Sequence, residues 1–201
     1  MLAVGLVLTG LTTGCGSQGA RNTIKLGGNL EMTGESASYG ISSRNGIELA
    51  LKEQNEKGGV LDKKVELVVA DNKSEATEAT NAMQKLIPQD RVIGVIGPNL
   101  SSVVIASTAV SGAAKTADIS PMGTNPQVDG LGKVKPYNFR ACFIDPFQGT
   151  VMAHFALNTP KVKRAAIMID NSSDYSKGLA QFFKKQFEKG GGEVVAEEVY
   201  L

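Results

Sequence analysis

The chain has 201 residues, of which 42% are hydrophobic and 20% are charged, and its formal net charge is +1. These values are ordinary for one or two globular domains with a hydrophobic core. No basic stripe with interleaved aromatic residues occurs, so we expect no nucleic-acid partner.

The first 21 residues predict the remnant of an export signal, a lipidation site and a tether. An uncharged apolar run over 2–11 is too short to span a bilayer and fits the apolar region of a signal peptide. A signal peptide usually has a basic segment before this apolar region, and none is present. We therefore expect the natural N-terminus of the protein to differ from residue 1 of this sequence. The segment LTTGC over 11–15 resembles a bacterial lipobox, although its leucine lies four residues before Cys15 rather than three. We expect a lipid on Cys15 and a polar tether after it, with a free thiol on a disordered tail as the alternative.

From residue 22 onward, predicted strands and helices alternate. Short runs rich in β-branched residues predict buried strands, and longer segments with one apolar face predict helices. These elements are strands over 24–30, 65–70, 92–96 and 117–120 and helices over 39–56, 75–87 and 101–115. The helix over 75–87 is expected to bury Ala79, Met83 and Leu86. Their order predicts a parallel sheet with helices on both faces, which is an α/β fold.

The pattern changes near Pro136, where 136–140 predicts an extended connection. Helices over about 145–158 and 175–189 and strands over 165–169 and 193–201 follow it. Two strands cannot bury both faces of a sheet, so we expect the chain to be a C-terminally truncated fragment. Residues 22–140 then form the first lobe, and residues 141–201 begin an incomplete second lobe.

Hydroxyl groups gather in the loops after two predicted strands. Ser101 and Ser102 open the helix that follows 92–96, and Thr124 follows 117–120. Such loops meet at the rim of a parallel sheet where α/β folds bind ligands, and a helix N-terminus there favours a carboxylate or a phosphate. Helix capping explains the two serines equally well, and a turn explains Thr124.

Short motifs follow one another in a specific order across residues 22–201. Among them are Ile24-Lys25-Leu26-Gly27, Thr33-Gly34 with Tyr39-Gly40, Val95-Ile96-Gly97-Pro98 with Ser101-Ser102, Ile119-Ser120-Pro121 with Thr124-Asn125-Pro126, Asp145 with Gln148-Gly149, and Asp174-Tyr175 with Gly178-Leu179. Together they resemble the branched-chain amino-acid-binding proteins of ABC transporters, the periplasmic-binding-protein type I group. The start of the chain and residues 71–74 are more similar to Gram-positive members, which tether the protein to the membrane.

The resemblance implies two flavodoxin-like lobes with parallel sheets, each a three-layer αβα arrangement, around a ligand cleft. It implies an extracytoplasmic lipoprotein on the outer face of the bacterial membrane, or in the periplasm. This protein would capture an amino acid, with leucine, isoleucine or valine expected, and deliver it to the membrane permease of an ABC importer. No enzymatic activity, cofactor or metal is expected.

The resemblance also assigns residues to the ligand, namely Tyr39, Ser101, Ser102, Met122, Gly123, Thr124 and Tyr175. The Ser101 and Thr124 hydroxyls would bind the ligand carboxylate, and the Met122 carbonyl would accept a hydrogen bond from the ammonium. The family often has a small residue at the position of Met122. Tyr39 would cover the ligand side chain, unless it is simply a packed aromatic, and Tyr175 would face the cleft from the second lobe. The usual acidic partner of the ammonium would lie beyond residue 201.

Two other functions remain open. The same fold serves as the ligand-binding domain of sensors and receptors for amino acids, amides or related molecules. An enzyme on a flavodoxin-like sheet ranks last, because the chain offers no nucleophile or acid–base pair with a plausible partner. The single histidine, His154, has no acidic or cysteine partner at metal-ligand spacing, so we expect it to be structural.

Overall fold

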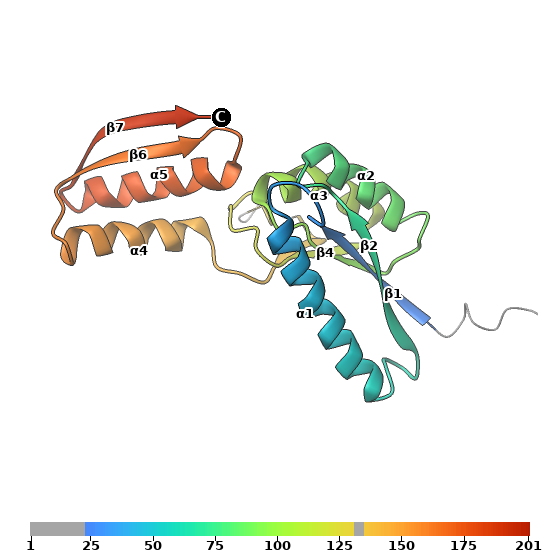
Figure 1. Ribbon diagram of the computed structural model, residues 1–201. Coiled ribbons are helices and arrows are strands. Elements are labelled where there is room, and N and C mark those ends of the chain that lie inside the picture. Colours follow the sequence, from blue (N-terminus) through green and yellow to red (C-terminus); the bar gives the residue numbers. More distant parts are fainter. Residues whose placement is uncertain (1–22, 131–134) are drawn as a thin grey trace, which may run out of the picture.

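The computed structural model of the protein describes residues 23–130 and 135–201 (Figure 1). Cys15, with the predicted signal remnant and tether, lies outside the described residues. Within them, no helix combines the length and the apolar character that crossing a membrane requires.

Strands and helices alternate along the chain, and the helices lie within two residues of their predicted ends. The elements are β1 (Thr23–Leu30), α1 (Ala37–Glu56), β2 (Lys64–Asp71), α2 (Ala76–Leu86), β3 (Gly94–Ile96), α3 (Ser101–Ala114), β4 (Ala117–Ser120), β5 (Asn138–Arg140), α4 (Asp145–Asn158), β6 (Arg164–Asp170), α5 (Asp174–Lys189) and β7 (Glu193–Tyr200). β3 is shorter than predicted. The expected extended connection ends in a strand of its own, β5, because its backbone pairs with β4.

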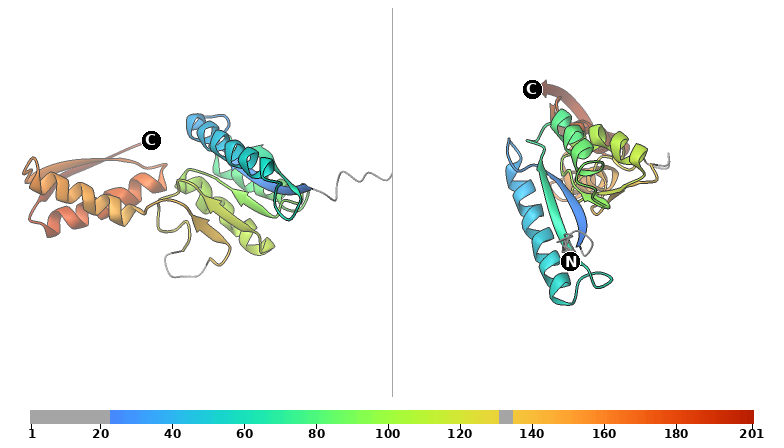
Figure 2. Two further views of the ribbon diagram at one scale, coloured as in Figure 1. Left: turned by 90° about the horizontal axis from the view of Figure 1, so that it is seen from below. Right: turned by 90° about the vertical axis from the view of Figure 1, so that its right-hand side faces the viewer.

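The first unit consists of β1 to β5 with α1 to α3. Its strands lie in the order β2-β1-β3-β4-β5, and every pairing is parallel. α1 covers one face of this sheet, and α2 and α3 cover the other (Figure 2). This arrangement confirms the predicted α/β fold with a parallel sheet.

The core of the first unit lies between the sheet and α2. Ala79, Met83 and Leu86 recur at helical spacing on α2 and are buried, as predicted. Met83 and Leu86 pack with Val92 and Val95 in one cluster. The opposite face of the sheet is packed less completely, because an apolar groove of about 600 Å³ remains between α1 and the sheet.

The second unit consists of the parallel pair β6–β7 with α4 and α5. α4 and α5 lie side by side, and both run away from the first unit (Figure 1). Phe187 and Ala153 are its buried apolar side chains within the described part of the chain. The N-termini of α4 and α5 lie next to the carboxyl ends of β3 and β4, so the two units meet at one rim of the five-stranded sheet.

Candidate ligand-binding site

A cavity of about 660 Å³ lies at this rim, between the two units. Its wall includes side chains that follow β1, β3 and β4 and side chains from α4 and α5. Of the seven residues predicted to bind a ligand, it contains Tyr39, Ser101, Ser102, Met122, Thr124 and Tyr175. Gly123 is not part of this wall. The fold therefore gathers six of the seven around one space, and their contact with a ligand remains a prediction.

Ser101 and Ser102 do not cap α3. The N-cap position belongs to Leu100, whose backbone is extended, and the two serines are the first residues of the helix itself. Their hydroxyls accept hydrogen bonds from other segments instead. The Ser101 hydroxyl accepts from the Asn125 N–H at 3.2 Å, and the Ser102 hydroxyl accepts from the Asp174 N–H at 2.8 Å. Capping is thus not the reason for these serines.

A buried carboxylate takes the place of a capping hydroxyl at the start of α3. Glu31 follows β1 and accepts hydrogen bonds from the Asn99 N–H at 3.0 Å, the Asn99 amide at 2.7 Å and the Leu100 N–H at 3.4 Å. A negative charge near a helix N-terminus is favourable, so Glu31 fixes the bend that leads into α3. Any anion in the cavity shares this N-terminus with Glu31. Glu31 is absent from the residues predicted for the site, although an acidic side chain directly after a buried strand indicates a functional or structural role at the rim of the sheet.

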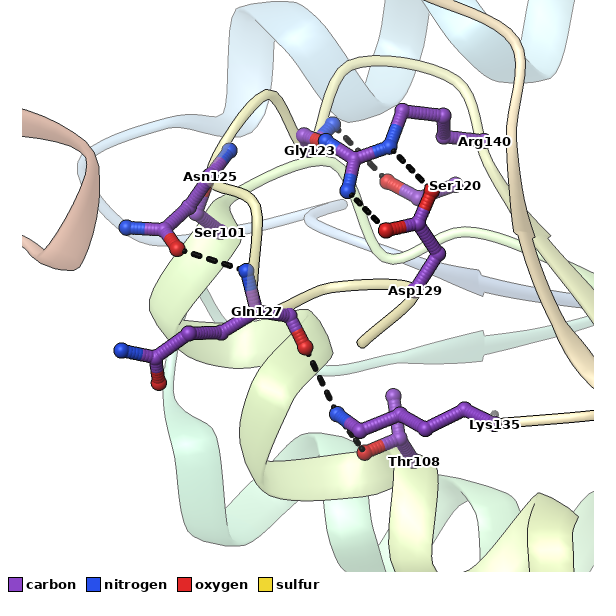
Figure 3. Close-up of polar contacts among 9 residues, drawn as sticks. All are labelled: Ser101, Thr108, Ser120, Gly123, Asn125, Gln127, Asp129, Lys135 and Arg140. Atoms are coloured by element: carbon purple, nitrogen blue, oxygen red, sulfur yellow. Dashed lines mark hydrogen bonds and ion pairs between the residues drawn. The ribbon is translucent and has the colours of Figure 1, made fainter. Parts of the chain in front are cut away.

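Polar contacts hold the loop after β4 in one shape (Figure 3). The Ser120 hydroxyl donates to the Pro98 carbonyl at 2.7 Å and accepts from the Gly123 N–H at 2.9 Å. Arg140 donates to the Gly123 carbonyl at 2.9 Å and to both carboxylate oxygens of Asp129. Because both peptide groups of Gly123 are bound within the protein, Gly123 supports the loop from behind the cavity wall.

Thr124 and Asp145 lie together where the two units join. The Asp145 N–H donates to the Thr124 carbonyl at 3.0 Å, and both side chains are buried. The Thr124 hydroxyl and the two Asp145 carboxylate oxygens form no hydrogen bond of good geometry with any described residue. Burial raises the pKa of Asp145, and the nearby Thr124 hydroxyl and the charge of Arg140 offset part of that rise. The Thr124 hydroxyl is thus buried beside the Asp145 carboxylate, without a hydrogen bond of good geometry to any described group.

Two tyrosines, together with Phe143, give the cavity its ring surfaces. Tyr39 on α1 is 48% exposed, which disfavours the alternative that it is a packed core aromatic. Tyr175 on α5 is 37% exposed, and its hydroxyl accepts a hydrogen bond from the Gln148 amide at 2.9 Å. Met122 is also partly exposed and lines the same cavity.

The cavity therefore combines hydroxyls, a helix N-terminus and ring faces. Across residues 23–130 and 135–201, no group of three or more His, Cys, Asp or Glu side chains is placed to hold a metal ion. The arrangement can form hydrogen bonds to a small carboxylate and cover an apolar side chain.

The sequence matches the family described as periplasmic binding protein over residues 23–201. It is 34% identical to the Leu/Ile/Val-binding protein BraC3 of Rhizobium johnstonii, over 90% of this chain and 48% of that protein. The fold is similar to that of the branched-chain amino acid transporter substrate binding protein LivJ from Streptococcus pneumoniae, solved in complex with isoleucine. The TM-score is 0.82 at 37% identity, with 89% of this chain and 50% of that chain covered.

A solute binding protein of an ABC transporter from Rhodopseudomonas palustris, in complex with 3,4-dihydroxy benzoic acid, is also similar. Its TM-score is 0.79 at 25% identity, over 89% of this chain and 47% of that chain. These relatives are named as binding proteins rather than enzymes. The chain spans about half the length of the relatives it matches.

Proposed function

Because this chain belongs to the periplasmic binding protein family, we propose that it captures a branched-chain amino acid, leucine, isoleucine or valine, in the cavity between its two units. As part of a whole protein it would present this amino acid to the permease of an ABC importer. A lipid on Cys15 would hold it at the outer face of the membrane. The observation that supports this proposal best is the buried Thr124 hydroxyl in the cavity wall, which has no hydrogen bond of good geometry and lies beside the α3 N-terminus.

The chemistry of the cavity wall suits a zwitterion with an aliphatic side chain. An unpaired charge is costly to bury, so a bound amino acid needs hydrogen bonds at its carboxylate. Ser101 and Thr124 supply neutral hydroxyls that do this without adding a full positive charge. Tyr39 and Tyr175 offer ring faces for the side chain from the first and the second unit.

An aromatic carboxylate is the second candidate ligand. It would use the same hydroxyls for its carboxylate, and the exposed rings of Tyr39 and Tyr175 could stack on its own ring. The relative that binds 3,4-dihydroxy benzoic acid supports this alternative. A sensor domain with the same fold would bind an amino acid at the same place, so ligand binding alone does not distinguish it from a transport protein.

Calorimetric titration of the 201-residue chain with leucine, isoleucine, valine and benzoate tests the proposal. We expect an aliphatic amino acid to bind and Thr124→Ala to weaken that binding by about 1–3 kcal/mol, the range for a hydrogen bond to a charged group. Thr124→Ser keeps the hydroxyl and should restore most of the affinity. Thr159→Ala, at the exposed far end of α4, is the matched control and should bind as the parent does.

Each outcome of these titrations tests a different part of the proposal. Binding of benzoate but of no amino acid would select the second candidate. Binding of none of the four compounds would contradict the proposed function of this chain. Unchanged leucine affinity in Thr124→Ala would place the ligand elsewhere, because the proposal needs this hydroxyl at the ligand carboxylate.

A further inference from the structure

Two side chains of the first unit hold the same peptide segment of the second unit. The Ser102 hydroxyl accepts a hydrogen bond from the Asp174 N–H at 2.8 Å, and the Asn125 amide nitrogen donates to the Asp174 carbonyl at 2.7 Å. Asp174 is the first residue of α5, so its N–H has no partner within the helix. A group that α5 cannot satisfy itself is therefore satisfied by the other unit.

The Asn125 side chain is fixed in the orientation that this contact needs. Its Oδ1 accepts from the Gln127 N–H at 2.9 Å, and its own N–H donates to the Ser101 hydroxyl at 3.2 Å (Figure 3). Because Oδ1 is bound to an N–H donor, the amide nitrogen is the group that faces Asp174. The side chain is 5% exposed, so water does not compete freely for it.

The close approach depends on a glycine one helical turn further along α5. A Cβ atom at Gly178 would lie 2.8 Å from the Asn125 amide nitrogen and 2.9 Å from a carboxylate oxygen of Asp145. Both distances are too short for ordinary contacts, so a side chain here would push α5 away from the first unit. Gly178 and Asn125 thus fit each other across the boundary between the units.

We propose that Ser102 and Asn125 form a latch that fastens the N-terminus of α5 to the first unit in the absence of ligand and so positions Tyr175 at the cavity wall. Tyr175 directly follows Asp174, so fixing the Asp174 peptide fixes the point from which the tyrosine projects. In this proposal the Ser102 hydroxyl acts on the second unit, whereas the resemblance assigned Ser102 to the ligand.

The effect of the latch on ligand affinity rests on the proposed function, whereas the latch itself does not. By holding the two units together beforehand, it would reduce the free energy that a ligand must supply to order them. Asn125 and Ser102 are in this sense positioning residues.

Asn125→Asp breaks the contact with Asp174 but keeps the hydrogen bond from Gln127 that shapes the loop. It keeps the oxygen that accepts from Gln127 but replaces the donor to Asp174 with a second acceptor, which faces a carbonyl. Gln127→Glu is the matched control, because it makes the same amide-to-acid change on an exposed side chain two residues away. Gln127 contributes only its backbone to the contacts drawn in Figure 3.

The measurement is the distance between spin labels, one on each unit, by pulsed electron paramagnetic resonance without ligand. The labels replace the exposed residues Lys57 and Lys185, in a chain that carries Cys15→Ser and Cys142→Ser. We expect one narrow distance distribution for the parent chain and for Gln127→Glu. In Asn125→Asp a second distance should appear, and the ratio of open to latched molecules should rise about fivefold or more, as expected for the loss of one hydrogen bond.

An unchanged distance distribution in Asn125→Asp would overturn the latch. If that variant does not fold by circular dichroism, Ser102→Ala gives the same test, because it removes the acceptor for the Asp174 N–H and leaves the loop of Asn125 intact. Since no ligand is present, a failure to bind amino acids leaves this result unaffected. If the parent chain binds leucine, Asn125→Asp should bind it more weakly, although this variant retains Tyr175.

Discussion

The two units of this protein are built from the same kind of βα repeat but bury very different amounts of apolar side chain. In the first unit, five parallel strands have helices on both faces, and Leu30, Met83, Leu86 and Val95 are shielded from solvent. In the second unit, two strands pair beside α4 and α5. Large apolar side chains there are exposed, among them Phe147, Phe155, Met168, Val195 and Val199.

The difference shows that an amphipathic helix does not bury its apolar face by itself. α2 and α5 are comparably amphipathic, yet α2 buries Ala79, Ala82, Met83 and Leu86, whereas α5 buries only Gly178 and Phe187. α2 packs on a wide sheet beside α3, while α5 has two strands and one helix to pack against. The width of the sheet, and not the helix pattern, therefore decides how much stabilisation each helix gains.

Two methionine-to-alanine substitutions, one in each unit, should show the largest difference in stability between the units. Met83 is fully buried on α2, and Met168 on β6 is 73% exposed. Met83→Ala removes buried methylene groups and leaves a cavity, so we expect the free energy of unfolding to fall by about 2–5 kcal/mol. Met168→Ala should change it by less than about 0.5 kcal/mol. Denaturant unfolding followed by circular dichroism measures both, and equal losses would mean that the second unit has a core of its own.

Local patterns in the sequence predicted the fold well because its elements depend on short-range signals. The spacing of Ala79, Met83 and Leu86 identified α2 and its buried face, and the alternation of strands and helices identified the parallel sheet. β5 was missed because Pro136 and the short length of 138–140 favour a connection. Only its pairing with β4, about 20 residues earlier in the chain, makes it a strand.

The candidate site was less predictable, because its contacts join residues far apart in the sequence. The hydroxyls after β3 and β4 could be placed at one rim from the order of the strands. The partners of Ser102 and Asn125 lie 72 and 49 residues away, and no local pattern indicates them. The same holds for Glu31, which binds a loop 68 residues further on. Their residue types also made Ser101 and Ser102 candidates for capping α3, whereas Leu100 occupies the N-cap position.

Two glycine-to-alanine substitutions test how closely the units pack at their boundary. A Cβ at Gly178 would clash with Asn125 and Asp145, whereas one at Gly46, in the middle of α1, would meet nothing within 4 Å. We expect Gly178→Ala to lower the free energy of unfolding by about 1–3 kcal/mol, as overpacking does. Gly46→Ala should raise it by up to about 1 kcal/mol, because alanine favours a helix. Thermal unfolding compares them, and an undisturbed Gly178→Ala would show that the units do not pack closely here.

Two buried aspartates should give the smallest change in stability. One lies inside the first unit and the other where the units meet, so they compare the cost of a buried charge at the two places. Burial raises the pKa of both Asp118 and Asp145 above the ordinary value of 3.8. A folded state that holds a proton more tightly than the unfolded state is favoured below pH 3.8, and that advantage is lost as the pH rises through the raised pKa. The two residues differ in their partners. Asp118 accepts hydrogen bonds from Ser111 and Asn138, whereas the Asp145 carboxylate has none of good geometry with a described residue.

Replacing Asp145 with asparagine removes a buried charge and breaks no hydrogen bond of good geometry, and the Thr124 hydroxyl can face the new amide oxygen instead. We therefore expect Asp145→Asn to be more stable than the parent at pH 7 and equally stable at pH 3, where the parent carboxyl is protonated. Asp118→Asn should gain less stability at pH 7, because the hydrogen bonds from Ser111 and Asn138 would then reach a neutral amide oxygen instead of a charged carboxylate. Denaturant unfolding at the two pH values measures the difference. If Asp145→Asn is destabilising at pH 7, the charged carboxylate has a favourable partner at the boundary, and the two units are held together by that charge as well as by the latch.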